Sequence, residues 1–209
     1  DVGVNAQGAA KLPKANAQFC EPSRPTTFLI GVEEHRRWEI MIMPGETPQD
    51  FETDAAVWKL LSRWLTPEDG TLWRRASYRF HALVASRWRD GRVFLAGDAA
   101  HVNNPLGGFG LNSGIHDAIS LGDMLAEVIQ EGVDDNLLDL YHRQRHTVNM
   151  EYVQQLSVKN KKNLEEKDPE LRMQRIRELQ ETCADPVKAR VFLLNSSMIN
   201  SIARANAIL

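Results

Sequence analysis

The chain contains 209 residues, of which 43% are hydrophobic and 25% charged, and its 25 basic residues nearly balance its 28 acidic residues, giving a net charge of −3. This composition is typical of a soluble globular protein and excludes the strongly basic surface that attracts nucleic acid or an anionic membrane. Two cysteines, Cys20 and Cys183, are too few for a disulfide framework or a four-cysteine zinc site, so we expect no metal site and a reducing compartment, the cytoplasm. No apolar run reaches the roughly 18 residues that a membrane span needs.

The first half of the chain alternates in the manner of β-strands. Residues 1–18 show no period and are predicted to be a loop or a frayed end. Residues 24–44 predict a β-hairpin, because side chains of two kinds alternate along its second half. The apolar spacing over 51–65 predicts a helix. A second alternating run at 78–88 leads into an Asp-Gly turn, and the apolar run 92–97 predicts a buried strand.

The second half is predicted to be mainly helical. After Gly110 the apolar period changes to about 3.6 residues, which predicts a helix that ends at Gly132. Gly114, Ala118 and Gly122 lie four residues apart on a face with almost no side chains, so another segment is expected to approach the helix backbone there. Residues 135–209 are helical by composition. The apolar stripe of the first helix consists of Leu111, Ile115, Ala118, Leu125 and Ile129.

We therefore expect an α/β (α+β) fold with a mixed β-sheet and C-terminal helices. Its three regions are a strand-rich region at 1–88, a strand–loop–helix unit at 89–131 and a helical region at 132–209.

The segment that carries chemistry is 91–117, GRVFLAGDAAHVNNPLGGFGLNSGIHD. Its strand places the carboxylate of Asp98 at a strand's carboxyl end, where α/β folds bind ligands. Three glycines follow within four residues and permit direct backbone contact with a ligand, and the next helix adds free N–H donors with partial positive charge. No lysine follows the glycines, which excludes a phosphate loop, and Ser113 replaces the third glycine of a dinucleotide fingerprint. Spacing alone indicates a site for a flat or anionic ligand, and equally allows a plain turn with a flexible loop.

The stretch GRVFLAGDAAHVNNPLGGFGLNSGIHDA resembles the second flavin-binding motif of the FAD-dependent aromatic hydroxylases, the p-hydroxybenzoate hydroxylase family. The stretches YRFHALVASRWRDGRVFLAGDAAH and CEPSRPTTFLIGVEEHRRWEIMIMPGE are similar to the branch that acts on 3-(3-hydroxyphenyl)propionate and related phenols, and the resemblance spans most of residues 20–160. It implies a flavoprotein monooxygenase that uses FAD, NADH or NADPH, and O2 to hydroxylate a small phenolic substrate through a flavin C4a-hydroperoxide. In such an enzyme, 1–88 would form the substrate side and 89–131 the second flavin-binding motif.

The resemblance also implies which residues contact FAD. Asp98 would accept a hydrogen bond from a ribityl hydroxyl, and Pro105 would lie against the isoalloxazine edge. The backbone that follows would contact the pyrimidine end of the flavin. The complete expected set is Gly97, Asp98, Pro105, Gly107, Gly108, Gly110, Leu111 and Asn112.

No residue is assigned to deprotonation of the phenol, so the catalytic residues are left unknown. Tyr78 and His81 lie in a predicted strand and His101 adjoins the glycine loop, and a core or turn role is predicted for each. His142 and His146 lie four residues apart on a helix without a third metal ligand nearby, and are predicted to be solvated.

Two elements of this family are missing from the chain: the N-terminal Rossmann-like unit with GxGxxG, and an Asp-Gly element near the pyrophosphate. We therefore expect the C-terminal portion of a longer enzyme, which alone binds FAD weakly or not at all and turns over no phenol. An apolar face left by the missing unit would favour a homodimer. Two alternatives stay open: a stand-alone binding or interaction module descended from this family, and a flavin-dependent oxidase or halogenase-like relative.

Overall fold

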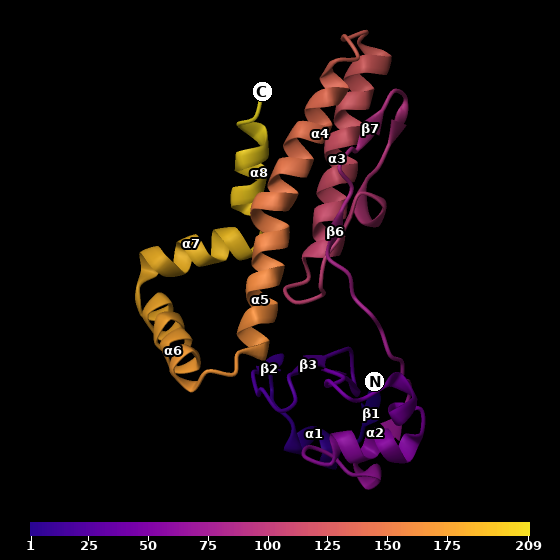
Figure 1. The fold of residues 1–209 in the computed structure, drawn as a ribbon, viewed down its shortest axis with the longest axis vertical. Coiled ribbons are helices and arrows are strands. Elements are labelled where there is room, and N and C mark those ends of the chain that lie inside the picture. The colour runs from indigo at the N-terminus through magenta and orange to yellow at the C-terminus, as the bar shows by residue number, and fades with distance from the viewer. The chain divides into compact units, whose positions relative to one another are not determined.

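A computed structural model describes all of residues 1–209, and the chain divides into two compact units (Figure 1). The first, here called the sheet unit, consists of Asp1–Arg79 and Asn163–Pro169. The second, the helical unit, consists of Phe80–Lys162 and Glu170–Leu209. Residues 80–88 thus pack with the segment that follows them.

An antiparallel sheet of five strands forms the centre of the sheet unit. The predicted hairpin is confirmed: residues 26–30 pair with residues 36–40, and Phe28 lies opposite Trp38. Every pairing is antiparallel, so the sheet is not the mixed sheet expected from the sequence. In spatial order the strands are β2 (Ala17–Phe19), β3 (Thr26–Ile30), β4 (His35–Ile40), β1 (Val2–Val4) and β5 (Gly70–Leu72).

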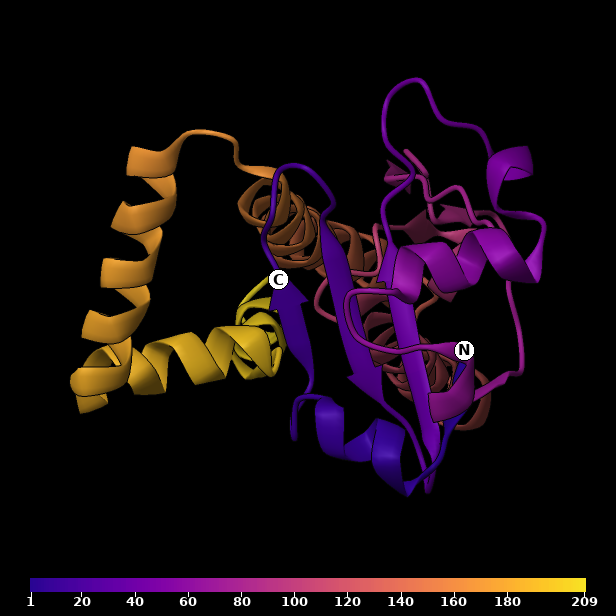
Figure 2. The same cartoon turned by 90° about the horizontal axis from the view of Figure 1, so that it is seen from below.

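Helix α2 (Asp54–Leu61) crosses one face of this sheet (Figure 2). It begins after Thr53, whose hydroxyl accepts a hydrogen bond from the Ala56 N–H at 3.2 Å, as an N-cap residue does. The helix predicted within 51–65 is therefore confirmed. Single 3-10 turns flank it at Pro48–Phe51 and Pro67–Asp69. The fully buried core of the unit consists of Val2, Val4, Leu12, Phe28, Leu61 and Leu65.

The prediction of a loop for residues 1–18 is wrong. Strand β1 lies between β4 and β5, and Val2 is fully buried. Helix α1 (Ala6–Lys11) follows, capped by the Asn5 side chain, which accepts from the Gly8 N–H at 2.8 Å. A strand of three residues is too short to show a period, and its pairing partners lie more than thirty residues away along the chain.

Helices dominate the second unit. Helix α3 (Phe109–Gln130) lies beside α4 (Leu137–Val148), which continues through a π-helical turn, Asn149–Gln154, into α5 (Gln155–Glu165) (Figure 1). Three more helices complete the chain: α6 (Pro169–Ala184), α7 (Pro186–Ser196) and α8 (Ile199–Asn206). None of these helices is long and apolar enough to cross a membrane.

The strands predicted at 78–88 and 92–97 are much shorter than expected. Two-residue strands form two small antiparallel pairs: β6 (Leu83–Val84) with β9 (His101–Val102), and β7 (Arg89–Asp90) with β8 (Val93–Phe94). The predicted Asp-Gly turn is confirmed between β7 and β8. The run 92–97 is not a buried strand, since Val93 is 67% exposed. An apolar run forms a buried strand only where other strands pair with it in a larger sheet. Here the only paired strand is β7, which has two residues.

The long helix predicted after Gly110 is confirmed, and Gly132 follows its end with a φ of +70°, as a C-terminal glycine does. A close backbone approach occurs at Gly114, where an added Cβ would lie 3.1 Å from the Gly97 Cα. No atom lies within 4 Å of the equivalent position at Gly122, so the expected approach holds for one glycine and fails for the other. Much of the apolar stripe is exposed, with Leu111 at 77%.

Candidate functional site

The eight predicted cofactor-binding residues all lie at the N-terminal end of α3 in the helical unit. Gly97 and Asp98 form a 3-10 turn, Gly97–Ala99, packed against the second turn of the helix. Pro105 and the glycines belong to the loop and first turn that follow. Asp98, Gly107, Gly108, Leu111 and Asn112 are exposed, whereas Gly97, Pro105 and Gly110 are half-buried.

Helix α3 follows two glycines whose backbone φ angles are positive, a conformation that favours glycine. Gly108, the N-cap, has a left-handed φ of +68°, and Gly107 before it has a φ of +110°. The N-cap has no side chain to accept from the first-turn N–H groups, and the first turn contains no acidic residue. These N–H groups are therefore available as hydrogen-bond donors, and the helix dipole adds partial positive charge at the same point.

The loop is held from both sides by its own polar atoms. The Gly108 N–H donates to the Pro105 carbonyl at 3.0 Å, and the Asn112 side chain donates back to the Gly108 carbonyl at 2.8 Å. The buried side chain of Asn104 accepts from the Leu106 N–H at 3.2 Å. The loop thus has a defined conformation even though its glycines are exposed.

Side chains of the π-helical turn and of α5 hold the same loop from behind. Gln154 donates to the Val102 carbonyl at 3.3 Å, and Asn160 donates to the Leu106 carbonyl at 3.2 Å. An added Cβ at Gly107 would overlap the Phe109 ring and lie 2.9 Å from the Asn160 amide nitrogen. The left-handed loop and α5 are therefore fitted closely to each other.

Behind the Gly97–Asp98 turn lies a buried charged cluster, here called the Asp117 cluster, which consists of His101, Asp117 and Arg145. The Asp117 carboxylate accepts from His101 Nε2 at 2.8 Å, from Arg145 Nε at 2.8 Å and from the Gly97 N–H at 3.1 Å. Burial alone would raise the pKa of Asp117, but the hydrogen bond from His101 and the charge of Arg145 outweigh it and lower that pKa. Asp117 is therefore a buried carboxylate that stays ionised.

Sequence reasoning missed Asp117 and Arg145. Neither belongs to a short motif, and their ion pair joins residues 28 positions apart, a contact that no local pattern reveals. His101 is buried, as its predicted core role requires.

The other histidines and the tyrosine considered from the sequence lie apart from the glycine loop in the chain. Tyr78 and His81 are exposed and lie outside any strand, contrary to prediction. His142 and His146 are half-buried, contrary to the prediction that they are solvated. Their ring centroids lie 5.1 Å apart, and the His146 ring makes an edge-on contact with the buried Trp88 ring at a centroid distance of 5.7 Å. Burial, with the neighbouring His142, lowers the pKa of His146.

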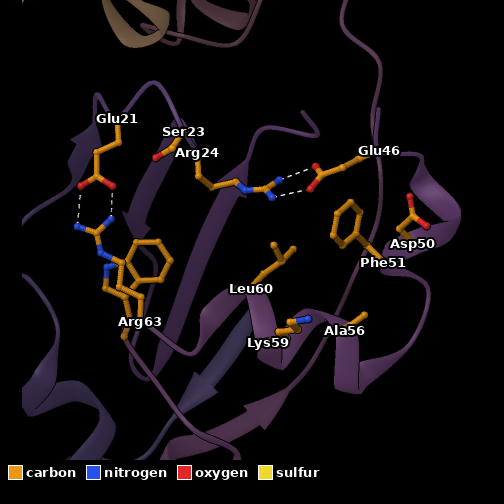
Figure 3. Close-up of a pocket in the computed structure, with 11 residues that line it drawn as sticks. Glu21, Ser23, Arg24, Glu46, Asp50, Phe51, Ala56, Lys59, Leu60 and Arg63 are labelled. Atoms are coloured by element: carbon orange, nitrogen blue, oxygen red, sulfur yellow. Dashed lines mark hydrogen bonds and ion pairs between the residues drawn. The ribbon is translucent and has the colours of Figure 1, made fainter. Parts of the chain in front are cut away.

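A separate hollow of about 630 Å³ lies within the sheet unit, between α2 and the loops at one end of the sheet (Figure 3). Two ion pairs line it: Arg24 binds Glu46 through both carboxylate oxygens, at 2.5 and 2.6 Å, and Arg63 binds Glu21 in the same manner. The hydrogen bond from Arg24 lowers the pKa of Glu46 to about 2. Both guanidinium groups are thus already paired, and the hollow presents neither of them free to an added anion.

Comparison with known proteins places these features in context. The family described as "FAD binding domain" matches residues 22–156. The 3-(3-hydroxy-phenyl)propionate/3-hydroxycinnamic acid hydroxylase of Escherichia coli (strain SE11) is 42% identical over 127 residues, which cover 60% of this chain and 23% of that enzyme. This chain thus matches less than a quarter of the length of its curated relatives.

Solved structures of flavin enzymes share the fold. The crystal structure of p-nitrophenol 4-monooxygenase PnpA from Pseudomonas putida matches 81% of this chain and 45% of its own, with a TM-score of 0.72 and 28% identity. The flavin-dependent monooxygenase PieE, solved in complex with FAD and substrate, matches 95% of this chain and 35% of its own, with a TM-score of 0.64. Its identity of 23% supports the shared fold alone.

Proposed function

Because this chain belongs to the family of FAD-binding domains, we propose that it forms the flavin-ring side and the substrate side of a monooxygenase that hydroxylates a phenolic ring. The observation that carries the proposal is the uncapped N-terminus of α3, preceded by a left-handed glycine loop and flanked by an exposed carboxylate, Asp98. The 42% identity to a hydroxylase of 3-hydroxyphenyl substrates supports a phenol as the substrate class.

The residues present fit FAD on structural grounds. Nothing lies within 4 Å of where a Cβ of Gly108 would stand, so space is open in front of the first turn. The donors that face it are main-chain N–H groups, which suit the carbonyl oxygens and ring nitrogens of a flavin's pyrimidine end. The exposed Asp98 carboxylate offers an acceptor for a sugar-alcohol hydroxyl.

In the proposed site, Asp98 orients the ribityl chain, and the backbone at Gly108, Gly110, Leu111 and Asn112 holds the ring end. When bound, FAD supplies the transfer of electrons from NADH or NADPH and the activation of O2. The chain contributes N–H dipoles aligned by α3, which stabilise negative charge at the pyrimidine end of the ring where it develops. The loop contacts at Asn104 and Asn160 keep those donors in place before any ligand binds.

A chimera tests this proposal. The matched section of the Escherichia coli hydroxylase is replaced by the corresponding section of this chain, and the purified protein is assayed for bound FAD, NADH oxidation, O2 uptake and hydroxylated product. We expect retained FAD and product formed in step with NADH oxidation. Asp98→Ala should lower FAD retention, whereas Asp123→Ala, which removes an exposed carboxylate farther along α3, should leave it unchanged.

Other outcomes contradict the proposal in distinguishable ways. NADH oxidation that releases only hydrogen peroxide, with every phenol tried, indicates an oxidase-like relative. Halide-dependent product indicates a halogenase-like one. A folded chimera without flavin, whose content does not depend on Asp98, indicates a binding module.

A further inference from the structure

The Asp117 cluster lies entirely inside the helical unit and reaches no solvent. The side chains of His101 and Asp117 are 0% exposed and that of Arg145 is 3% exposed. His101 belongs to β9, Asp117 to α3 and Arg145 to α4, so three separate elements meet at one carboxylate. Removing charges from water is costly, and such a group persists only where donors surround it.

The geometry directs the donors of the cluster at Asp117. His101 is stacked on the Trp88 ring at 5.4 Å, which fixes its orientation, and its Nε2 faces the carboxylate at 2.8 Å. Its Nδ1 is buried without a hydrogen-bond partner, so the ring's polar contact is the one that Nε2 makes with Asp117. Arg145 approaches the other oxygen through Nε and extends toward the Ser113 carbonyl of α3 at 3.5 Å.

The third donor connects this cluster to the glycine motif. The Gly97 N–H donates to the same Asp117 oxygen that His101 contacts, at 3.1 Å. Gly97 has a φ of +58°, and its Cα lies so close to Gly114 that a Cβ there would stand 3.1 Å away. One carboxylate thus fixes the turn onto α3, and the next residue in that turn is Asp98.

We propose that Asp117, held by His101 and Arg145, is a positioning residue that sets the Gly97–Asp98 turn against α3 and thereby determines how tightly the site binds FAD. This inference rests on the proposed function. Asp117 acts through Asp98 and touches no ligand itself. A merely structural role would lower the stability of the whole unit without changing this turn selectively.

The first test needs no flavin. Amide hydrogen exchange of the 209-residue chain is compared among wild type, Asp117→Asn and the matched control Asp69→Asn, which alters a buried carboxylate of the sheet unit. We expect Asp117→Asn to accelerate exchange at Gly97 by roughly tenfold more than at α4 amides of the same unit. The control should leave Gly97 unchanged. Equal acceleration throughout the helical unit, or none at Gly97, overturns the proposal.

Asp117→Asn leaves Arg145 buried without its counter-charge and can therefore unfold the helical unit. A second pair of variants, at His101, keeps that ion pair and tests the same role. His101→Gln keeps an N–H donor near the position of Nε2, whereas His101→Leu removes the donor and leaves the Asp117–Arg145 pair intact. We expect normal Gly97 protection in the first and faster exchange in the second. The same Gly97 protection in both variants contradicts the proposed role.

The second test joins the cluster to the ligand. FAD fluorescence titrations of the Escherichia coli chimera measure Asp98→Ala alone, Asp117→Asn alone and the two combined. If Asp117 acts through Asp98, it weakens FAD binding by about tenfold when Asp98 is present and by less than about twofold when Asp98 is replaced. Additive losses overturn the positioning role in binding. If the chimera with the unsubstituted section does not bind FAD saturably, the proposed function loses support, and hydrogen exchange still decides whether Asp117 sets the turn.

Discussion

Two adjacent glycines of the loop should respond very differently to the same substitution. At Gly108 the backbone is in the ordinary left-handed region and a Cβ meets nothing within 4 Å. Alanine there costs about 1–2 kcal/mol of strain, partly offset by about 0.4–1 kcal/mol from the less flexible unfolded chain. We therefore expect Gly108→Ala to lower the free energy of unfolding by about 1 kcal/mol.

At Gly107 the φ of +110° lies outside that region, and a Cβ would overlap the ring of the buried Phe109. Backbone strain of about 1–3 kcal/mol adds to roughly 1–3 kcal/mol for displacing a packed ring. With the same unfolded-state offset, we expect Gly107→Ala to cost roughly 3 kcal/mol, about 2 kcal/mol more than its neighbour.

Urea unfolding followed by far-UV circular dichroism measures both variants, because most helices lie in the helical unit that contains the loop. The comparison is valid if the dependence on urea concentration stays the same, so that a shifted midpoint reports stability. Gly108→Ala should nevertheless lower FAD retention in the chimera more than its small stability loss explains, since its methyl group occupies the open space before the first turn. Equal costs at the two glycines, or a larger cost at Gly108, would refute the reasoning.

Three further predictions concern the surrounding scaffold. Gly122→Ala should raise the free energy of unfolding measured with urea by up to about 1 kcal/mol, because alanine has the higher helix propensity, whereas Gly114→Ala on the same helix should lower it because the added Cβ meets backbone at 3.1 Å. Tyr141→Phe removes a buried hydroxyl that donates to a main-chain carbonyl at 2.7 Å, and should cost about 1–2 kcal/mol in the same assay. The hydrogen bond from Lys11 lowers the pKa of Asp69 in the folded protein. The stabilisation that Asp69 gives the folded state is therefore complete above the ordinary pKa of an aspartate, near 4, and is lost as the pH falls from there toward the lowered pKa. Thermal unfolding of Asp69→Asn should therefore depend less on pH between about 5 and 2, and an unchanged profile would contradict the assignment.

Local signals in the sequence predicted the parts of the fold that are local. Helix α3 follows from its own period and ends just before Gly132, and the β3–β4 hairpin follows from adjacent alternating runs. Strand β1 did not follow, because Val2–Val4 is too short to alternate and pairs with residues distant in the chain. The prediction of a buried strand at 92–97 failed for a different reason. The run is apolar, but only one two-residue strand pairs with it.

The candidate site divides in the same way. The glycine motif and Asp98 belong to one short segment of the chain, so the sequence alone predicts that they lie near one helix N-terminus. The Asp117 cluster joins residues 16 and 28 positions apart, and its charges are compensated only in three dimensions. In one sequence, a buried ionised carboxylate looks the same as a solvated one.

The π-helical turn Asn149–Gln154 makes the glycine loop sensitive to chain length. A π turn accommodates one more residue than an α turn, so the side chains beyond it are rotated by about 100° relative to an uninterrupted helix. That rotation selects Asn160 as the residue whose amide meets the Leu106 carbonyl. Deleting one residue from the turn would leave every side chain of the loop intact, yet would aim a different face of α5 at it. Homologues that differ here by a single insertion or deletion should therefore anchor this loop with different residues.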